Sequence, residues 1–222
     1  MSGIEDTLTC FKNLDSADLQ FLDERKTQIA YLKGETIFKQ GAFSPHVIFI
    51  NDGLVRVFLQ TGINKQTNIR LAVKGDFMAF SSIFYENIYQ YSAIAIKDSE
   101  ICMIEKEAMK QLLLRKPEFA MQITSRNYQN ESRYLEIINN LSYKHMRGKL
   151  ASAILYLSSE KFEAENVFRY LNRQNIADFA SITLESAVKF IKEFEKEEVL
   201  EIKGKDILIK NREAIIEIFN KG

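Results

Sequence analysis

Cysteine and histidine, which ligate transition metals and serve as nucleophile or general base, occur only twice each in this chain of 222 residues. The two cysteines, Cys10 and Cys102, form no CxxC pair, and the two histidines, His46 and His145, are far apart in the sequence. A metal-dependent enzyme built on a barrel needs several histidine and carboxylate ligands that converge inside it. We therefore expect no metal site, no cofactor and no enzymatic activity.

Two short helices joined by a tight turn are predicted between Leu171 and Lys192. Apolar residues recur in both at spacings of three and four, namely Ile176, Phe179 and Ala180 in the first helix and Leu184, Ala187, Val188 and Ile191 in the second. Thr183 can cap the second helix through its hydroxyl, although Ser186 stands where a full capping box needs Glu or Gln. A DNA-binding helix-turn-helix shows this pattern, and so does an ordinary helical hairpin.

The residues that follow favour the first of these alternatives. Two β-prone runs, 198–202 and 207–209, flank the polar turn Lys203-Gly204-Lys205-Asp206, which is typical of a hairpin. A helix-turn-helix followed by a hairpin is a winged helix. The tip of such a wing commonly lies against phosphates, where Lys203 and Lys205 would act as point charges.

The first hundred residues are built from short β-prone runs. These runs are Val47–Ile50, Leu54–Leu59, Asn68–Val73, Tyr91–Ile96 and Glu100–Ile104. Turns that carry Gly, Asn or Asp separate them, and a short helix of about 16–25 precedes them. Strands at this spacing predict an antiparallel barrel or sandwich.

A long helix is predicted from Pro117 to about Ser142. A heptad seam runs along it through Ile123, Asn127, Asn130, Tyr134, Ile137 and Leu141. We predict that this seam pairs with a second copy of the chain, and that a second stripe of Tyr128, Leu135 and Ile138 packs on the barrel. The alternative is that one stripe is simply core. A two-fold dimer would place its recognition helices about one DNA turn, roughly 34 Å, apart.

The order of these elements resembles the Crp/Fnr family of bacterial transcription regulators. The resemblance is carried by GETIFKQG at 34–41, INDGLVRVF at 50–58, KGDF at 74–77 and the stretch 172–209. It implies an α+β chain with three parts: an antiparallel, jelly-roll-like β-roll of the cyclic-nucleotide-binding kind (1–116), a dimerisation helix (117–142) and a winged helix-turn-helix (143–222). It also implies a homodimer that binds double-stranded DNA under ligand or redox control, often with contacts to RNA polymerase.

The segment that binds cyclic nucleotides in other members departs from their pattern here. Phe80 stands where those members hold the ribose with Glu, and Tyr91 stands where Arg holds the cyclic phosphate. A phenol cannot replace the bidentate charge of an arginine. We therefore expect no control by cyclic AMP, and the family's iron–sulfur branch needs a cysteine cluster that this sequence lacks. An unidentified effector could still occupy the corresponding pocket, namely Phe80, Ser81, Ser82, Tyr91, Ser92, Tyr134 and Leu135, or these residues could form a collapsed core.

The resemblance also assigns the DNA-contacting positions. The positions that read bases in the family fall on Thr183, Leu184, Glu185, Ser186 and Lys189, and Arg173 and Gln174 are expected to clamp phosphates. Glu185 can accept from a cytosine amino group, and Lys189 can reach guanine or phosphate. The acidic end of the second helix, at Glu193, Glu195, Glu197 and Glu198, is predicted to face solvent.

The net charge and the hydropathy of the chain bear on its affinity for DNA and on its location in the cell. Thirty cationic and thirty anionic side chains give a net charge of zero, so DNA affinity must come from a local patch. No apolar run reaches the length of a membrane span, and no signal sequence is evident, so we expect a cytoplasmic protein. The alternative is a dimeric ligand-sensing or protein-interaction module that has lost specific DNA binding.

Overall fold

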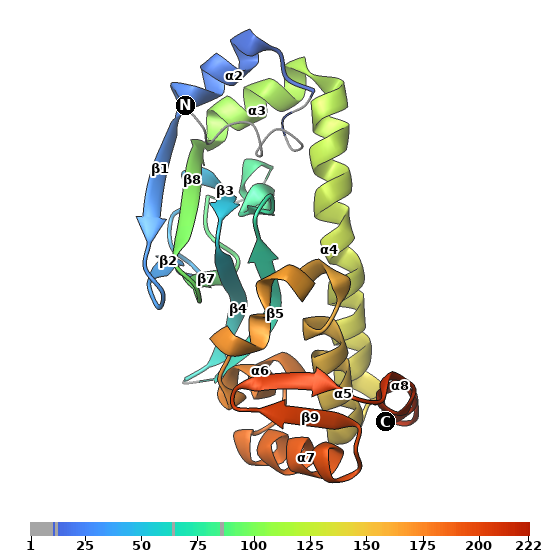
Figure 1. The fold of residues 1–222 in the computed structure, drawn as a ribbon. Coiled ribbons are helices and arrows are strands. Elements are labelled where there is room, and N and C mark those ends of the chain that lie inside the picture. Colours follow the sequence, from blue (N-terminus) through green and yellow to red (C-terminus); the bar gives the residue numbers. More distant parts are fainter. Residues whose placement is uncertain (1–10, 12, 64, 85–86) are drawn as a thin grey trace. The chain divides into compact units, whose positions relative to one another are not determined.

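The computed structural model describes residues 11, 13–63, 65–84 and 87–222 (Figure 1). The chain forms two compact units. The first comprises residues 1–60 and 70–133, and the second comprises residues 61–69 and 134–222. Cys10 lies outside the described residues. The predicted division at residues 116 and 142 stays a prediction.

Two four-stranded sheets make up most of the first unit, and only residues 61–69 of the strands β4 and β5 are assigned to the second. One sheet has the order β1-β8-β3-β6 and the other the order β2-β7-β4-β5. The strand bounds are β1 Lys26–Tyr31, β2 Thr36–Phe38, β3 His46–Asp52, β4 Leu54–Gly62, β5 Lys65–Val73, β6 Phe77–Met78, β7 Ser92–Ala95 and β8 Ser99–Glu105. Pairing is antiparallel between β1 and β8, β3 and β8, β3 and β6, β2 and β7, and β4 and β7. The predicted antiparallel β-roll is confirmed.

Strand β3 is buried on both of its faces. Val47 and Phe49 belong to the same core cluster as Leu112 of α3 (Lys106–Arg115) and Phe119 of α4 (Pro117–Tyr143), whereas Ile48 points to the opposite face. Each large apolar side chain buried in this way contributes about 1.5–3 kcal/mol. The short helix α2 (Ser16–Asp23) covers the same side as α3 (Figure 1). A strand buried on two faces reads as an unbroken apolar run, which explains the VIFI sequence.

The turn between β3 and β4 depends on Gly53. Its φ of +120° is a conformation that other residues rarely adopt, and a Cβ there would lie 2.1 Å from Ser99 Oγ. The Leu54 amide donates to the same Ser99 Oγ. The turn predicted at Asn51-Asp52-Gly53 is therefore held against the start of β8.

The second unit contains the predicted helix-turn-helix and hairpin, and both are confirmed. The helices are α5 (Met146–Leu157), α6 (Arg173–Ala180), α7 (Leu184–Lys196) and α8 (Arg212–Lys221), with short 3₁₀ turns at Glu160–Glu165 and Val167–Tyr170. Strands β9 (Leu200–Lys203) and β10 (Asp206–Ile209) pair as an antiparallel hairpin. The fold is thus an antiparallel sheet domain followed by a long helix and a winged helix.

One residue of the predicted seam of α4 and all three residues of its second stripe lie in directions other than those predicted, whereas Tyr134 and Leu141 of the seam are exposed. Ile123, assigned to the dimer seam, is fully buried in the core of the first unit beside Phe119. Tyr128, Leu135 and Ile138, assigned to the barrel, are 69%, 61% and 59% exposed. Heptad spacing identifies two stripes but not which one faces the sheet, and the buried Phe119–Ile123 pair decides it. The seam assignment of Ile123 was wrong, and so was the packing of the second stripe.

Candidate nucleic-acid interface

The turn between α6 and α7 fixes where α7 begins. Asn172 and Asn175 cap the start of α6 reciprocally, and Ser181 ends it in the left-handed conformation with φ of 52°. The Ile182 amide then donates back to the Ala177 carbonyl. As predicted, the Thr183 hydroxyl caps α7, accepting from the Ser186 amide at 3.2 Å.

One face of α7 is buried and the opposite face is open. Ala187, Ile191 and Phe194 point into the core of the second unit. Thr183, Leu184, Glu185 and Lys189 are exposed, and Ser186 is half-buried. Leu184 had been counted among the packed residues, yet it is 41% exposed, which agrees instead with its assignment as a base-reading position. The open face can present both a carboxylate and an ammonium group to a groove.

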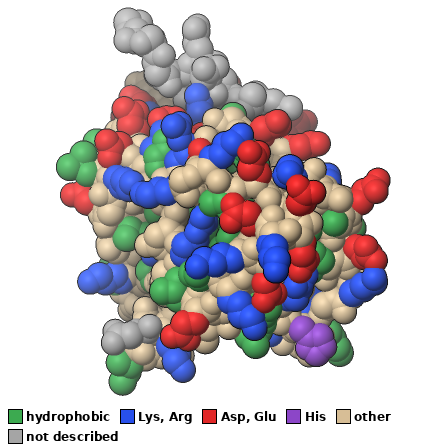
Figure 2. Space-filling view, turned by 60° about the horizontal axis from the view of Figure 1, so that its bottom comes forward, with side chains coloured by type: hydrophobic (Ala, Val, Ile, Leu, Met, Phe, Trp, Pro, Cys, Tyr) green, Lys and Arg blue, Asp and Glu red, His purple; other side chains and the backbone are tan. Residues whose placement is uncertain are grey.

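Two lysines on this face escaped the sequence analysis. Lys192 and Lys196 are exposed and follow Lys189 by three and seven residues, which places all three on one side of the helix. The spacing itself was the signal that could have found them. On the face shown in Figure 2, lysine and arginine side chains are interleaved with carboxylates rather than gathered into one basic field.

The two predicted phosphate clamps at the start of α6 differ in their surroundings. Arg173 is half-buried, and this burial lowers the pKa of its guanidinium. Gln174 is exposed, but its amide donates to Asp178 Oδ1 at 2.7 Å, so its donor is already engaged within the helix. Arg173 is therefore the better placed of the two for a phosphate.

The wing carries its two lysines at the tip of the hairpin. Lys205 is exposed, and the Lys203 side chain is 62% exposed while its ammonium lies 3.2 Å from Glu201 Oε1. Gly204 between them has φ of +64°, which suits the tight turn. Both ammonium groups lie at the surface, where an approaching phosphate could meet them.

The acidic end of α7 is not simply solvated. Glu195 is exposed as predicted, and Glu198 is exposed beside Lys210 at 3.3 Å. Glu193 and Glu197 instead bind Arg147 of α5, at 3.0 Å and 2.8 Å. Glu197 is exposed as predicted and Glu193 is half-buried, and their pairing with Arg147 was not predicted, because that cation lies 46 and 50 residues earlier in the chain.

The predicted effector residues of the first unit are engaged with the protein itself. Tyr91 Oη accepts from the Ala79 amide at 2.8 Å, Ser82 Oγ donates to the Ala79 carbonyl at 2.7 Å, and Ser92 Oγ accepts from the Gln40 amide at 3.0 Å. The Phe80 ring contacts Phe77 and Phe84, and Ser81 is exposed. Tyr134 and Leu135 belong to the second unit, where they are 38% and 61% exposed.

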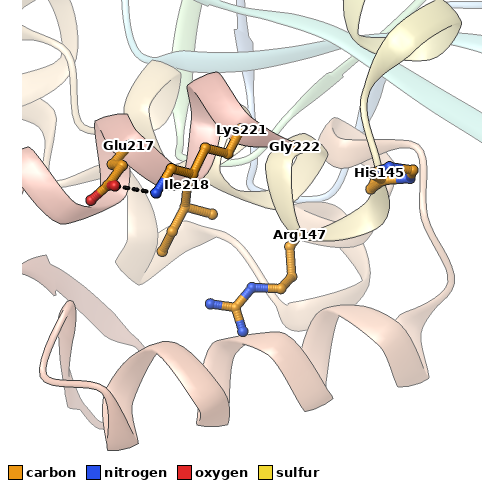
Figure 3. Close-up of a pocket in the computed structure, with 6 residues that line it drawn as sticks. All are labelled: His145, Arg147, Glu217, Ile218, Lys221 and Gly222. Atoms are coloured by element: carbon orange, nitrogen blue, oxygen red, sulfur yellow. Dashed lines mark hydrogen bonds and ion pairs between the residues drawn. The ribbon is translucent and has the colours of Figure 1, made fainter.

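A pocket of about 390 Å³ lies in the second unit, away from these predicted residues. It is lined by His145, Arg147, Glu217, Ile218, Lys221 and Gly222 (Figure 3). Lys221 pairs with Glu217, and the Arg147 side chain extends from the start of α5 toward α7. Its cations are therefore matched by carboxylates.

Neither a metal cluster nor a membrane helix is found in the described part of the chain. No group of three or more His, Cys, Asp or Glu side chains there could hold a metal ion. None of the described helices is long and apolar enough to cross a bilayer. Cys102 is buried, and this burial raises the pKa of its thiol to about 11.

Comparison with known families agrees with this arrangement. Residues 28–116 match the cyclic nucleotide-binding domain family, and residues 148–218 match the Crp-like helix-turn-helix domain family. The chain belongs to the Crp/Fnr family. This Crp/Fnr protein is 29% identical over 214 residues to the fumarate and nitrate reduction regulatory protein of Vibrio cholerae, covering 92% of this chain and 84% of the relative. It is also 29% identical to electron transport regulator A of Shewanella oneidensis, covering 88% and 80%.

Solved structures share the fold of this Crp/Fnr protein. A transcriptional regulator of the Crp/Fnr family from Eubacterium rectale superposes with a TM-score of 0.76 at 15% identity, covering 97% of this chain and 100% of that chain. The c-di-GMP responsive global regulator of Xanthomonas campestris gives 0.75 at 14% identity, covering 89% and 100%. Together with the family matches, these findings identify a DNA-binding transcription regulator of the Crp/Fnr type.

Proposed function

We propose that this regulator is a homodimer that reads a pseudo-palindromic DNA site through the open face of α7. The observation that carries the proposal is the division of α7 into a buried apolar face and an exposed face bearing Glu185 and Lys189. A helix that is fixed at its start by a cap and a tight turn can enter a major groove with its N-terminal residues against base edges. The winged helix of each copy would then bind one half-site.

The exposed stripe of α4 supports dimerisation. Met121, Tyr128, Leu135 and Ile138 recur at spacings of seven, seven and three, and Met121 is the most exposed of them at 71%. Large apolar side chains repeated along one helix face are typical of a seam between helices. Tyr134 and Leu141 flank this stripe and remain available to it, whereas Asn127 uses its amide to donate to the Ile123 carbonyl.

The side chains of α7 suggest how bases would be read. Glu185 can accept from the amino group of cytosine, and Lys189 can donate to guanine or to a phosphate. Leu184 can contact a thymine methyl group. Arg173, Lys203 and Lys205 would hold the phosphate backbone on either side. We also place the protein in the cytoplasm with its DNA, and contact with RNA polymerase stays a prediction.

Control by cyclic AMP is not part of this proposal. The oxygens of Tyr91 and Ser92 accept backbone amides, and the buried Arg70 donates to the Phe77 carbonyl and lies 3.4 Å from Asp76. Tyr91 and Ser92 carry no positive charge, and the Arg70 guanidinium is already engaged with the Phe77 carbonyl and Asp76, so these groups do not present the bidentate cation that a buried cyclic phosphate requires. We infer that DNA binding is either constitutive or controlled by an effector of another class.

Enrichment of fragmented genomic DNA on the effector-free protein tests the proposal. We expect a recurring palindrome with half-sites about one turn, roughly 10 base pairs, apart. Lys189→Ala is expected to weaken binding to that site by about 1–3 kcal/mol while the dimer stays intact. Lys110→Ala, which removes an exposed lysine of α3, is the matched control and should bind normally.

Two results would count against this assignment. Equal binding by the Lys189→Ala variant and the unaltered protein would mean that another face meets DNA. Absence of any enriched sequence, with binding that is also insensitive to salt, would favour a protein-interaction module, because phosphate contacts always release counterions.

A further inference from the structure

The C-terminal end of α7 carries negative charges that destabilise a helix at this position. Glu193 and Glu197 are one helical turn apart, where like charges destabilise a helix. Both also lie near the negative end of the helix dipole, where cations are preferred. Lys196 lies in this last turn, and a cation from elsewhere in the fold is added to it at the two carboxylates.

Arg147 supplies that cation from the start of α5. Its Nη1 donates to Glu193 Oε2 at 3.0 Å and to Glu197 Oε1 at 3.1 Å, and its Nη2 donates to Glu197 Oε2 at 2.8 Å. The guanidinium also lies 5.0 Å from the ring centroid of the buried Phe194. A planar fork can span two carboxylates in this way, whereas a lysine ammonium cannot.

The start of α5 is itself held in place. The Lys144 ammonium donates to the Phe219 carbonyl of α8, and the His145 amide donates to the Gly222 carbonyl. Gly148 and Gly222 approach so closely that a Cβ on Gly148 would lie 2.8 Å from Gly222 Cα. In Figure 3 the Arg147 side chain leaves this fixed point and crosses the pocket toward α7.

The same carboxylates connect with the open face of α7. Lys189 Nζ lies 3.9 Å from Glu193 Oε1, while Arg147 binds the other oxygen of that carboxylate. The Lys189 side chain is 68% exposed. The position of Glu193 is thus coupled both to the fixed start of α5 and to a side chain that would contact DNA.

We propose that Arg147 is a positioning residue for DNA recognition. By joining the C-terminal end of α7 to the start of α5, it sets the orientation at which the open face of α7 meets the groove. This inference rests on the proposed function, because it concerns how well the correct sequence is distinguished from others. Its signature is a loss of sequence preference that exceeds the loss of general DNA affinity.

Four variants test the proposal: Arg147→Ala, Arg147→Lys, the triple variant Arg147→Ala with Glu193→Gln and Glu197→Gln, and Arg212→Ala. The last removes one exposed arginine of α8 and controls for net charge. For each variant, the affinities for the enriched DNA and for a scrambled duplex are measured at one salt concentration, together with the melting temperature. We expect Arg147→Ala to lower the ratio of the two affinities about tenfold, since the pair's charged hydrogen bonds are lost.

The other variants separate positioning from stability. The triple variant removes the unpaired carboxylates, so its melting temperature should recover while the affinity ratio stays low. Arg147→Lys should also keep a low ratio, because it restores the charge without the fork. A normal ratio in either variant would overturn the proposal.

The unaltered protein is measured first. If it shows no preference for any DNA, the proposed function fails, and the role of Arg147 in recognition fails with it. If the unaltered protein discriminates and Arg147→Ala discriminates equally well, only the inference about Arg147 is refuted.

Discussion

At the scale of single residues, the polar groups around Tyr91 are occupied by the protein's own backbone. Tyr91 Oη and Ser92 Oγ accept the amides of Ala79 and Gln40. A cyclic phosphate would have to replace these bonds without gaining an arginine at position 91. The polar side chains of this segment are therefore hydrogen-bonded within the protein rather than free to bind a phosphate.

We predict that cyclic AMP does not bind. At millimolar concentration it should shift the melting temperature by less than about 1 °C, whereas a ligand at 100 times its Kd adds about 2.7 kcal/mol of stability. Differential scanning fluorimetry measures this, with non-cyclic AMP as the matched control. A rise of several degrees with the cyclic nucleotide alone would show that the pocket rearranges to bind phosphate.

The charge cluster at the start of α2 makes stability depend on pH. A hydrogen bond from the Lys116 side chain and another from the Asp18 amide hold the pKa of Asp15 at about 2, below its ordinary 3.8. Because the folded pKa is depressed, the stabilisation is present above pH 3.8 and is lost as the pH falls toward 2. The same pair raises the pKa of Lys116.

We predict that Asp15→Asn makes the stability of the protein less dependent on pH in the acid range. Between pH 5 and pH 2.5, the melting temperature of the variant should fall less steeply than that of the unaltered protein. Glu100→Gln, at an exposed strand position, is the control and should follow the unaltered protein. Thermal melts followed by circular dichroism decide this, and parallel curves for Asp15→Asn and the unaltered protein would contradict it.

At the scale of elements, the predictability of each helix follows from how it is buried. The helices α6 and α7 were predicted because each buries one stripe, with Ala187 and Ile191 at helical spacing in α7. The helix α5 was not predicted, since seven of its twelve residues are buried and leave no clear polar face. The Arg147 contacts could not be predicted, because they join residues 46 and 50 positions apart.

For the helix α4, the sequence predicted the helix but not which of its faces is buried. Both of its stripes carry large apolar residues, so periodicity could not tell which one the sheet covers. Phe119 and Ile123 are buried in the core of the first unit, and Tyr128, Leu135 and Ile138 are exposed. The stripe proposed as the dimer seam is therefore the one that the sequence assigned to the barrel.

We predict that Leu135→Glu disrupts the dimer. Two copies of the new carboxylate would be buried without a partner, which should weaken association roughly 100-fold or more. Leu114→Glu is the matched control, because Leu114 is 77% exposed on α3 and lies outside the stripe. Sedimentation velocity over a range of concentrations measures both, and an unaltered dimer in Leu135→Glu would place the seam elsewhere.

At the scale of the whole molecule, a net charge of zero limits how strongly this protein can bind DNA without regard to sequence. Thirty cations are balanced by thirty anions, so no long-range field draws this protein to DNA in general. Affinity must come from local contacts on α6, α7 and the wing. Two linked copies multiply such contacts, and linkage can raise affinity about 10²–10⁴-fold without any new contact.

The most direct test of this account changes the spacing of the two half-sites. Five base pairs inserted between the half-sites of the enriched palindrome turn them by about half a helical turn, while every base that α7 would read is kept. We predict that affinity, measured by fluorescence anisotropy at fixed salt, falls about 100-fold or more, to that of a single half-site. Equal affinity for the two spacings would contradict a two-fold dimer that reads both half-sites at once.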